Sequence, residues 1–176
     1  MIEEFKDISI RGRLAYGATC LEEALHQLGI RDEYLDKLVL PRIWEFTSSS
    51  RLDEWDTQIN EIDPTCVLDI ELTEKTFDLT TISFNDYKAL FKCYQSLHKE
   101  IVELISEVIG IGVANLYGGT EDFSACTLES LANVIEICNK MKLKMPNVEP
   151  FRKSSFSEFH GWGKERPRES FSITKC

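Results

Sequence analysis

The sequence predicts a mainly α-helical protein, a single-domain helical bundle, and three observations predict this class. Apolar residues recur at helical spacing in most segments of the chain. The hydrophobic fraction of 43% and the length of 176 residues suit one domain whose core needs no disulfide or metal. We expect an acidic helical domain over residues 1–150 and a tail over residues 151–176.

The first predicted helix covers residues 10–29. Its apolar residues recur every three or four positions, which places them on one side only in a helix. They are Leu14, Ala18, Leu21, Leu25 and Leu28. Gly29 stands where a helix C-cap is expected.

Two further helices are predicted before residue 64. The first runs from Asp32 to Phe46, and we expect a kink at Pro41 because proline removes a backbone donor. The second covers residues 51–61, with Leu52, Trp55 and Ile59 directed inward.

Residues 64–82 allow two interpretations. Pro64 after Asp63 fits the start of a short helix. Alternating apolar residues favour instead a small β-hairpin near residues 66–82. These residues are Cys66, Leu68, Ile70, Leu72, Phe77 and Leu79. The sequence supports the two equally.

Residues 85–115 predict one long central helix. Their apolar stripe continues for about six turns, and Ser83 with Asp86 fits a capping box at its start. At about 1.5 Å per residue this helix would be about 45 Å long. We therefore expect the other helices, including a last one capped by Thr127 and ending near Pro146, to pack around it.

The tail differs from the rest of the chain in charge. Residues 152–176 hold six basic and three acidic side chains, which leaves 14 basic and 27 acidic side chains in the rest of the chain. Basic and aromatic residues together can stack on single-stranded nucleic acid. An acidic body would repel that ligand, so we expect the tail to pack on the body or to be loosely ordered.

The charge of the whole chain points to a basic partner. A net charge of −10 and a pI near 4.8 disfavour binding to nucleic acid or to anionic membranes. Residues 1–5 show no secretory pattern, and no run of 18 apolar residues occurs, so a cytoplasmic protein is expected.

The sequence offers little that predicts catalysis. His26 and Cys20 fall on different faces of their predicted helix, and so do His98 and Cys93. Neither H-E-x-x-H nor C-x-x-C occurs. We predict no catalytic residue, no metal and no cofactor, and therefore not an enzyme.

Acidic residues are densest between Arg51 and Thr80, with nine acidic against two basic side chains. They form either a solvated face or a surface for a basic partner, for which Trp55 could be an aromatic anchor. The predicted partner-binding carboxylates are Asp53, Glu54, Asp56, Glu61, Asp69, Glu71, Glu74 and Asp78.

Three short segments resemble a family of bacterial proteins. They are residues 13–17 (RLAYG) with 20–22 (CLE), 52–55 (LDEW) and 116–119 (LYGG). The chain resembles immunity proteins of contact-dependent growth inhibition and other polymorphic toxin systems. That resemblance implies a cytosolic inhibitor that binds one cognate toxin domain tightly, and it implies nothing about architecture. Two other classes stay open: a helical adaptor for a basic host protein, and an enzyme whose site assembles from distant residues.

Overall fold

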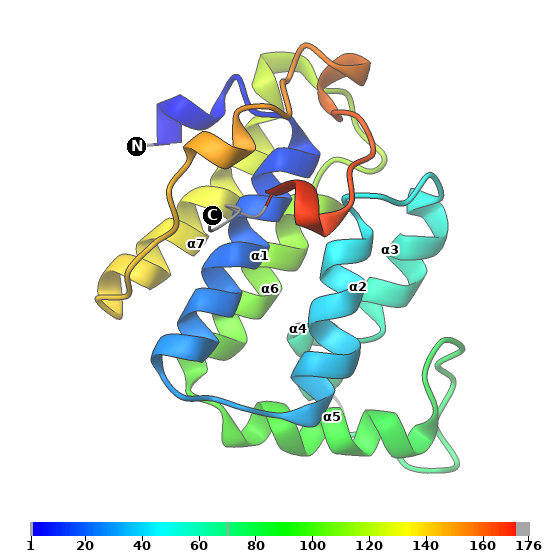
Figure 1. Cartoon of the computed structure of the whole chain (residues 1–176). Helices are drawn as coiled ribbons and strands as arrows, with labels where there is room; N and C mark the ends of the chain where they lie inside the picture. The colour runs from blue at the N-terminus through cyan, green and yellow to red at the C-terminus, as the bar shows by residue number, and fades with distance from the viewer. Residues whose placement is uncertain (1, 70, 172–176) are drawn as a thin grey trace.

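The structure, a computed structural model, describes residues 2–69 and 71–171 and is all-α (Figure 1). Its α-helices are α1 (Ile10–Gln27), α2 (Leu40–Glu45), α3 (Leu52–Asn60), α4 (Pro64–Asp69), α5 (Phe84–Ser96), α6 (Lys99–Val113) and α7 (Ala125–Lys140). Shorter turns are η1 (Ile2–Phe5), η2 (Leu35–Val39), η3 (Glu121–Phe123), η4 (Glu149–Phe151), η5 (Phe159–Gly161) and η6 (Arg168–Phe171). Within the described ranges no helix is both long and apolar enough to cross a bilayer.

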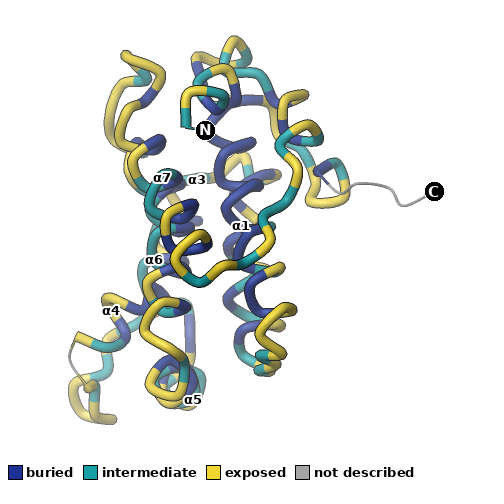
Figure 2. Tube along the Cα trace, turned by 90° about the vertical axis from the view of Figure 1, so that its left-hand side faces the viewer, coloured by how far each residue is buried: buried dark blue, intermediate teal, exposed yellow. Residues whose placement is uncertain are grey.

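Helices α1, α6 and α7 form the centre of the bundle, because α6 packs against both of the others. Figure 1 shows α5 crossing one end of this bundle and α2 and α3 beside it. Figure 2 shows α1 buried along most of its length, which agrees with its apolar stripe. Gly29 ends this helix as predicted, with a positive φ of 66° and with Ile30 N bonded to the carbonyl oxygen of Leu25.

The predicted helix over residues 85–115 is wrong, because the chain breaks into α5 and α6. Leu97 and His98 take extended backbone angles, with ψ of 154° and 141°. The capping box of Ser83 and Asp86 is confirmed at the start of α5. The last helix also starts earlier than predicted, at Ala125, and it ends at Lys140, so Thr127 lies buried in its first turn.

Of the two interpretations of residues 64–82, the helix is confirmed and the hairpin is wrong. Pro64 starts α4, and no strand forms in the described part of residues 66–82, from which Ile70 is excluded. The apolar side chains of this stretch pack against the core as half-buried residues instead of pairing across a ladder. Backbone groups are bonded locally, as where Tyr87 Oη accepts a hydrogen bond from Leu72 N at 2.8 Å.

The chain remains helical through Pro41, where a kink was predicted. A π-helical turn, η2, precedes Pro41, and Leu40 N bonds to the carbonyl oxygen of Leu35, five residues back. Because of this wider turn, Pro41 lies in the first turn of α2. Backbone N–H groups in the first turn of a helix have no intrahelical acceptor, so the N–H that proline lacks is not lost from a hydrogen bond.

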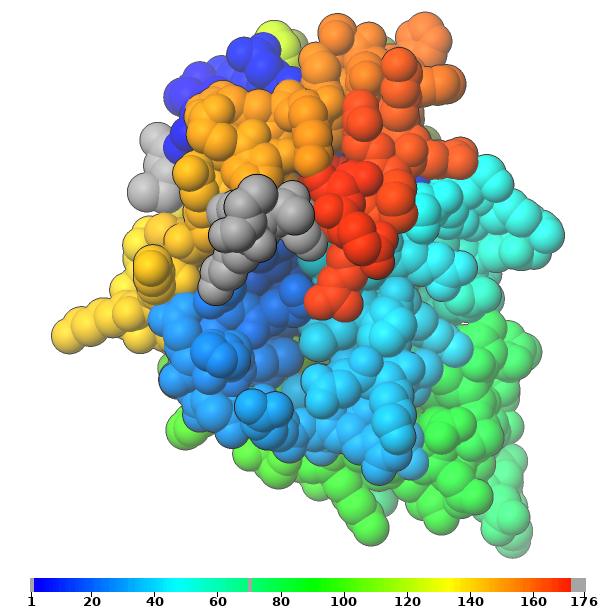
Figure 3. Space-filling model, viewed as in Figure 1, coloured from blue at the N-terminus to red at the C-terminus, as the bar shows by residue number. Residues whose placement is uncertain are grey.

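The described part of the tail lies on the body. Figure 3 shows the segment after residue 150 spread across one face of the molecule. Phe151 and Phe171 are buried in the same core cluster as α1 and α6. Ser9 Oγ and Ser154 Oγ are 2.7 Å apart, and Ile8 forms an isolated antiparallel bridge with Ser155.

Candidate functional site

The predicted acidic residues divide into two groups. Asp53, Glu54 and Asp56 lie on α3 with exposed or half-buried side chains. Asp69, Glu71, Glu74 and Asp78 are exposed at the end of α4 and on the connection that follows it. Figure 1 shows that connection at the end of the bundle crossed by α5, whereas the 114–124 connection lies at the opposite end.

Trp55 is not available as a partner anchor, and its prediction is wrong. Its side chain is 1% exposed, and its ring centroid lies 4.7 Å from that of Phe46. The indole Nε1 donates a hydrogen bond to the carbonyl oxygen of Arg42 at 2.7 Å. Trp55 shares the apolar stripe of α3 with Ile59, which turns it into the core.

Glu61 has a role inside the chain. Its carboxylate accepts hydrogen bonds from the backbone and hydroxyl groups of Thr80 and Thr81, at 2.5 to 2.9 Å. Partial burial acts to raise its pKa, but these hydrogen bonds outweigh that effect and hold the pKa of Glu61 below its ordinary value. Glu61 therefore anchors the end of the 71–82 connection, and its carboxylate is occupied by hydrogen bonds within the chain.

Exposed aromatic residues gather where the sequence did not predict a site. Among the described residues, the exposed large hydrophobic side chains are Leu28, Tyr117, Phe123 and Phe159. Tyr117 is 86% exposed and Phe159 is 64% exposed. The loops of these two residues are joined, since Thr120 Oγ1 donates to the carbonyl oxygen of His160 at 2.6 Å.

Tyr117 connects this aromatic group to the acidic helix α3. Its hydroxyl donates a hydrogen bond to Asp56 Oδ2 at 2.8 Å, and Asp56 Oδ1 accepts another from Asn60. The hydrogen bond to Asp56, with the charge of that carboxylate, raises the pKa of Tyr117. Beside the ring is a hollow of about 140 Å³ lined by Leu52, Asp53, Leu116, Tyr117 and Trp162.

The same loops hold most of the strained backbone of the described chain. Non-glycine residues with positive φ are Asp122, Phe123, Ser124, Lys142, Phe159 and His160. All except Lys142 belong to the two joined loops. Such conformations cost about 1–3 kcal/mol each and are concentrated at functional sites.

Buried Arg13 holds one of these strained loops in place. Its guanidinium donates to the carbonyl oxygens of Phe123 and Ser124 and to Thr127 Oγ1, and it lies over the Phe156 ring, 5.0 Å from the centroid. Burial lowers the pKa of Arg13 to about 10, so the side chain remains charged at neutral pH.

We name Asp53, Glu54, Asp56 and Tyr117, together with Phe159 on the joined loop, the acidic-aromatic surface. Exposed carboxylates can pair with lysine or arginine side chains, and an exposed aromatic ring beside them can stack on the same side chains. Arg51 pairs with Glu54 at its edge. Within the described ranges no three His, Cys, Asp or Glu side chains are grouped as metal binding requires.

The described chain is therefore all-α, and the acidic-aromatic surface is exposed on it. Comparisons with protein-family models, with curated proteins and with solved structures find no match for the chain.

Proposed function

We propose that this chain is an immunity protein that binds and neutralises a cognate toxin domain, a cationic nuclease domain being the best fit by charge. The observation that carries the proposal is Tyr117, an almost fully exposed tyrosine that is hydrogen-bonded to Asp56 beside the carboxylates of α3. The net charge of −10 supports it, because an acidic protein attracts a basic partner.

The surface would act in two ways. Carboxylates of Asp53, Glu54 and Asp56 would take the positions of nucleic-acid phosphates on the toxin and so deny it substrate. Charge of this kind mainly raises the association rate and selects the partner. Tyr117 and Phe159 would supply the buried aromatic contacts that usually dominate binding energy and slow dissociation.

A charge-reversal experiment tests the electrostatic part. Replacing Asp53, Glu54 and Asp56 by Lys should lower the association rate with the toxin encoded beside this gene by about tenfold or more at low salt. The control carries Lys at Glu71, Glu74 and Asp78, which makes the same change in net charge at the other end of the bundle. Binding kinetics over a range of ionic strength measure both. Equal effects of the two triple variants would show that only net charge matters and would refute this surface.

A truncation tests the aromatic part. Tyr117→Ala should weaken toxin binding by about 2 kcal/mol, roughly 30-fold, through faster dissociation. Leu28→Ala removes another exposed side chain, at the far end of α1, and should leave binding unchanged. Unaltered toxin inhibition by the Tyr117 variant would contradict the proposal.

A further inference from the structure

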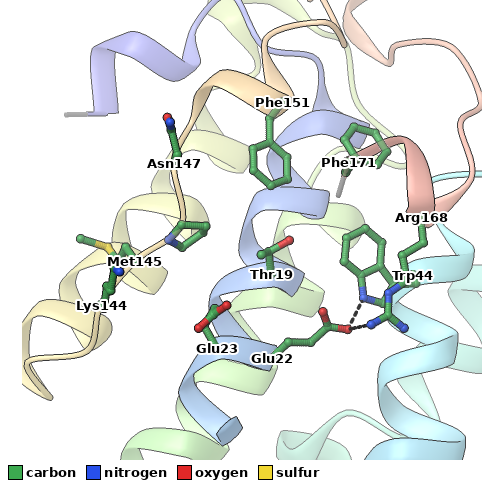
Figure 4. Close-up of a pocket in the computed structure, with 11 residues that line it drawn as sticks. Thr19, Glu22, Glu23, Trp44, Lys144, Met145, Asn147, Phe151, Arg168 and Phe171 are labelled. Carbon is green, nitrogen blue, oxygen red and sulfur yellow. Dashed lines mark hydrogen bonds and ion pairs between the residues drawn. The ribbon is translucent and has the colours of Figure 1, made fainter. Parts of the chain in front are cut away.

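A cleft of about 490 Å³ lies beside α1 (Figure 4). This volume is within the range of small-molecule sites, about 300–1,000 Å³. Thr19, Glu22 and Glu23 form its floor, at positions that share one face of α1. The remaining walls come from α2, from the 144–147 segment and from the tail: Trp44, Lys144, Met145, Pro146, Asn147, Phe151, Arg168 and Phe171.

The guanidinium group of Arg168 occupies one end of this cleft. Arg168 Nη2 lies 2.6 Å from Glu22 Oε1, and its guanidinium carbon lies 5.2 Å from the Trp44 ring centroid. Trp44 Nε1 donates to the same carboxylate oxygen at 2.7 Å, which fixes the orientation of Glu22. A carboxylate in the plane and an aromatic face above it are the two contacts by which proteins bind a guanidinium group.

Glu22 offers a second carboxylate oxygen besides the one that Arg168 contacts. Within the described residues, no hydrogen bond or ion pair goes to Glu22 Oε2, and Figure 4 shows the Glu22 carboxylate at the cleft floor. Burial raises the pKa of Glu22, against the hydrogen bonds from Trp44 and Arg168, so a guanidinium group at this place stabilises its charged form. Arg168 itself is half exposed at the cleft edge.

The other end of the cleft suits an amino-acid backbone. Figure 4 shows Glu23 directed toward the side that carries Lys144, and so away from Trp44. A carboxylate and an ammonium together complement the charges of a zwitterion. Phe171 and Phe151 give the cleft an apolar wall, since the Phe171 ring centroid lies 6.3 Å from that of Trp44 and 5.9 Å from that of Phe151.

We propose that this cleft binds a small guanidino compound of the arginine type, whose guanidinium takes the place on Trp44 and Glu22 that Arg168 occupies in the free protein. The ligand must displace Arg168. Removal of this side chain should therefore strengthen binding, whereas a residue that only supports the fold would give no such gain.

The experiment compares L-arginine with L-citrulline, which has a neutral urea in place of the guanidinium, by isothermal titration calorimetry at equal ionic strength. We expect Arg168→Ala to bind L-arginine at least fivefold more tightly than the parent chain does, and to bind L-citrulline at least tenfold more weakly than L-arginine. Adding Glu22→Gln to Arg168→Ala should weaken L-arginine binding at least tenfold. Adding Glu45→Gln, which neutralises an exposed carboxylate of α2 outside the cleft, should not change it.

Circular dichroism at the titration temperature establishes that each variant is folded, so that lost binding is not lost structure. Equal affinity for L-arginine and L-citrulline, or no detectable L-arginine binding by folded Arg168→Ala, overturns the proposal. Binding of an arginine-containing peptide without binding of free L-arginine also overturns it, because the site would then serve a protein partner.

Discussion

Arg11 and Arg13 lie two residues apart at the start of α1, and both are buried. Arg11 donates to the carbonyl oxygens of Phe46 and Ser49, and Arg13 bonds to the carbonyl oxygens of Phe5 and Lys6 and to the 123–127 turn. Burial is the main cause that lowers the pKa of each. Bonds from charged donors to backbone carbonyls offset the cost of placing cations in the core.

Replacing Arg13 by Met should lower the free energy of unfolding by about 3 kcal/mol or more, because several buried carbonyl groups lose their donor. Urea unfolding at pH 7 measures this loss. Arg152→Met is the control, since Arg152 is exposed and its ion pairs with Glu4 and Glu149 are worth at most about 1 kcal/mol. Similar losses in the two variants would show that Arg13 does not hold the surface loops.

Glu61 gives the fold a defined pH dependence. Its folded-state pKa is lowered, so its contribution to stability is present above the unfolded pKa of about 4.3 and is lost as pH falls through the folded-state value. Glu61→Gln should therefore destabilise the protein at pH 7, and do so less at about pH 3, because the charge of Glu61 is progressively lost below its unfolded pKa. Urea midpoints at both pH values, with Glu136→Gln of α7 as the control, measure it. An equal effect at both pH values would assign the loss to hydrogen-bond geometry alone.

The aromatic anchor shows where sequence reasoning fails at the scale of single residues. Trp55 and Tyr117 are both aromatic and near acidic residues, but Trp55 faces the core and Tyr117 faces solvent. The stripe of α3 already indicated that Trp55 is directed inward. Tyr117 joins Asp56 across 61 positions, a contact that only the tertiary fold creates. The one signal in the sequence was a tyrosine directly before Gly118 and Gly119 in a connection.

At the scale of elements, the sequence predicted helical content well and helix ends less well. The stripe from Tyr87 to Val108 predicts one helix, yet the chain bends at Leu97 and His98. Apolar spacing shows which residues face the core. The spacing continues without interruption from α5 into α6, so it does not reveal that the chain bends between them. Neither proline nor glycine marks this break, so local sequence rules gave no signal.

Helix α6 packs closely against α3 and α1 at Gly112. A Cβ atom there would lie 2.5 Å from Trp55 Cη2 and 2.8 Å from Leu14 Cδ1. Gly112→Ala should therefore destabilise the protein by about 1–3 kcal/mol through overpacking, despite better helix propensity. Gly110→Ala on the same helix meets only the Ser130 side chain, with Oγ at 3.0 Å, and should be near neutral. Thermal unfolding of both variants measures the difference in stability. A Gly112 variant more stable than the parent would show that position 112 does not pack this closely against Trp55 and Leu14.

At the scale of the whole molecule, the tail differs from the rest of the chain in charge but shares its buried core. The tail was distinguished in the sequence by its basic composition, and charge composition does not report burial. Phe151 and Phe171 enter the main core, and Arg166 N donates to the carbonyl oxygen of Thr47 at 2.8 Å. Apolar residues spaced 20 apart in a loop have no periodicity, so the sequence could not show this packing.

The described tail should consequently be part of one cooperative folding unit. A chain ending at Pro150 would lose both phenylalanines, each worth about 3–5 kcal/mol in a core, against a total stability of about 5–15 kcal/mol for a typical protein. We expect the shortened chain to lose its cooperative thermal transition and to bind a hydrophobic dye. Within the full chain, Phe151→Ala should cost about 3–5 kcal/mol, whereas Phe159→Ala should cost less than about 0.5 kcal/mol because its side chain is exposed. If residues 1–150 alone unfold cooperatively at the same temperature as the full chain, the tail only lies on a finished domain.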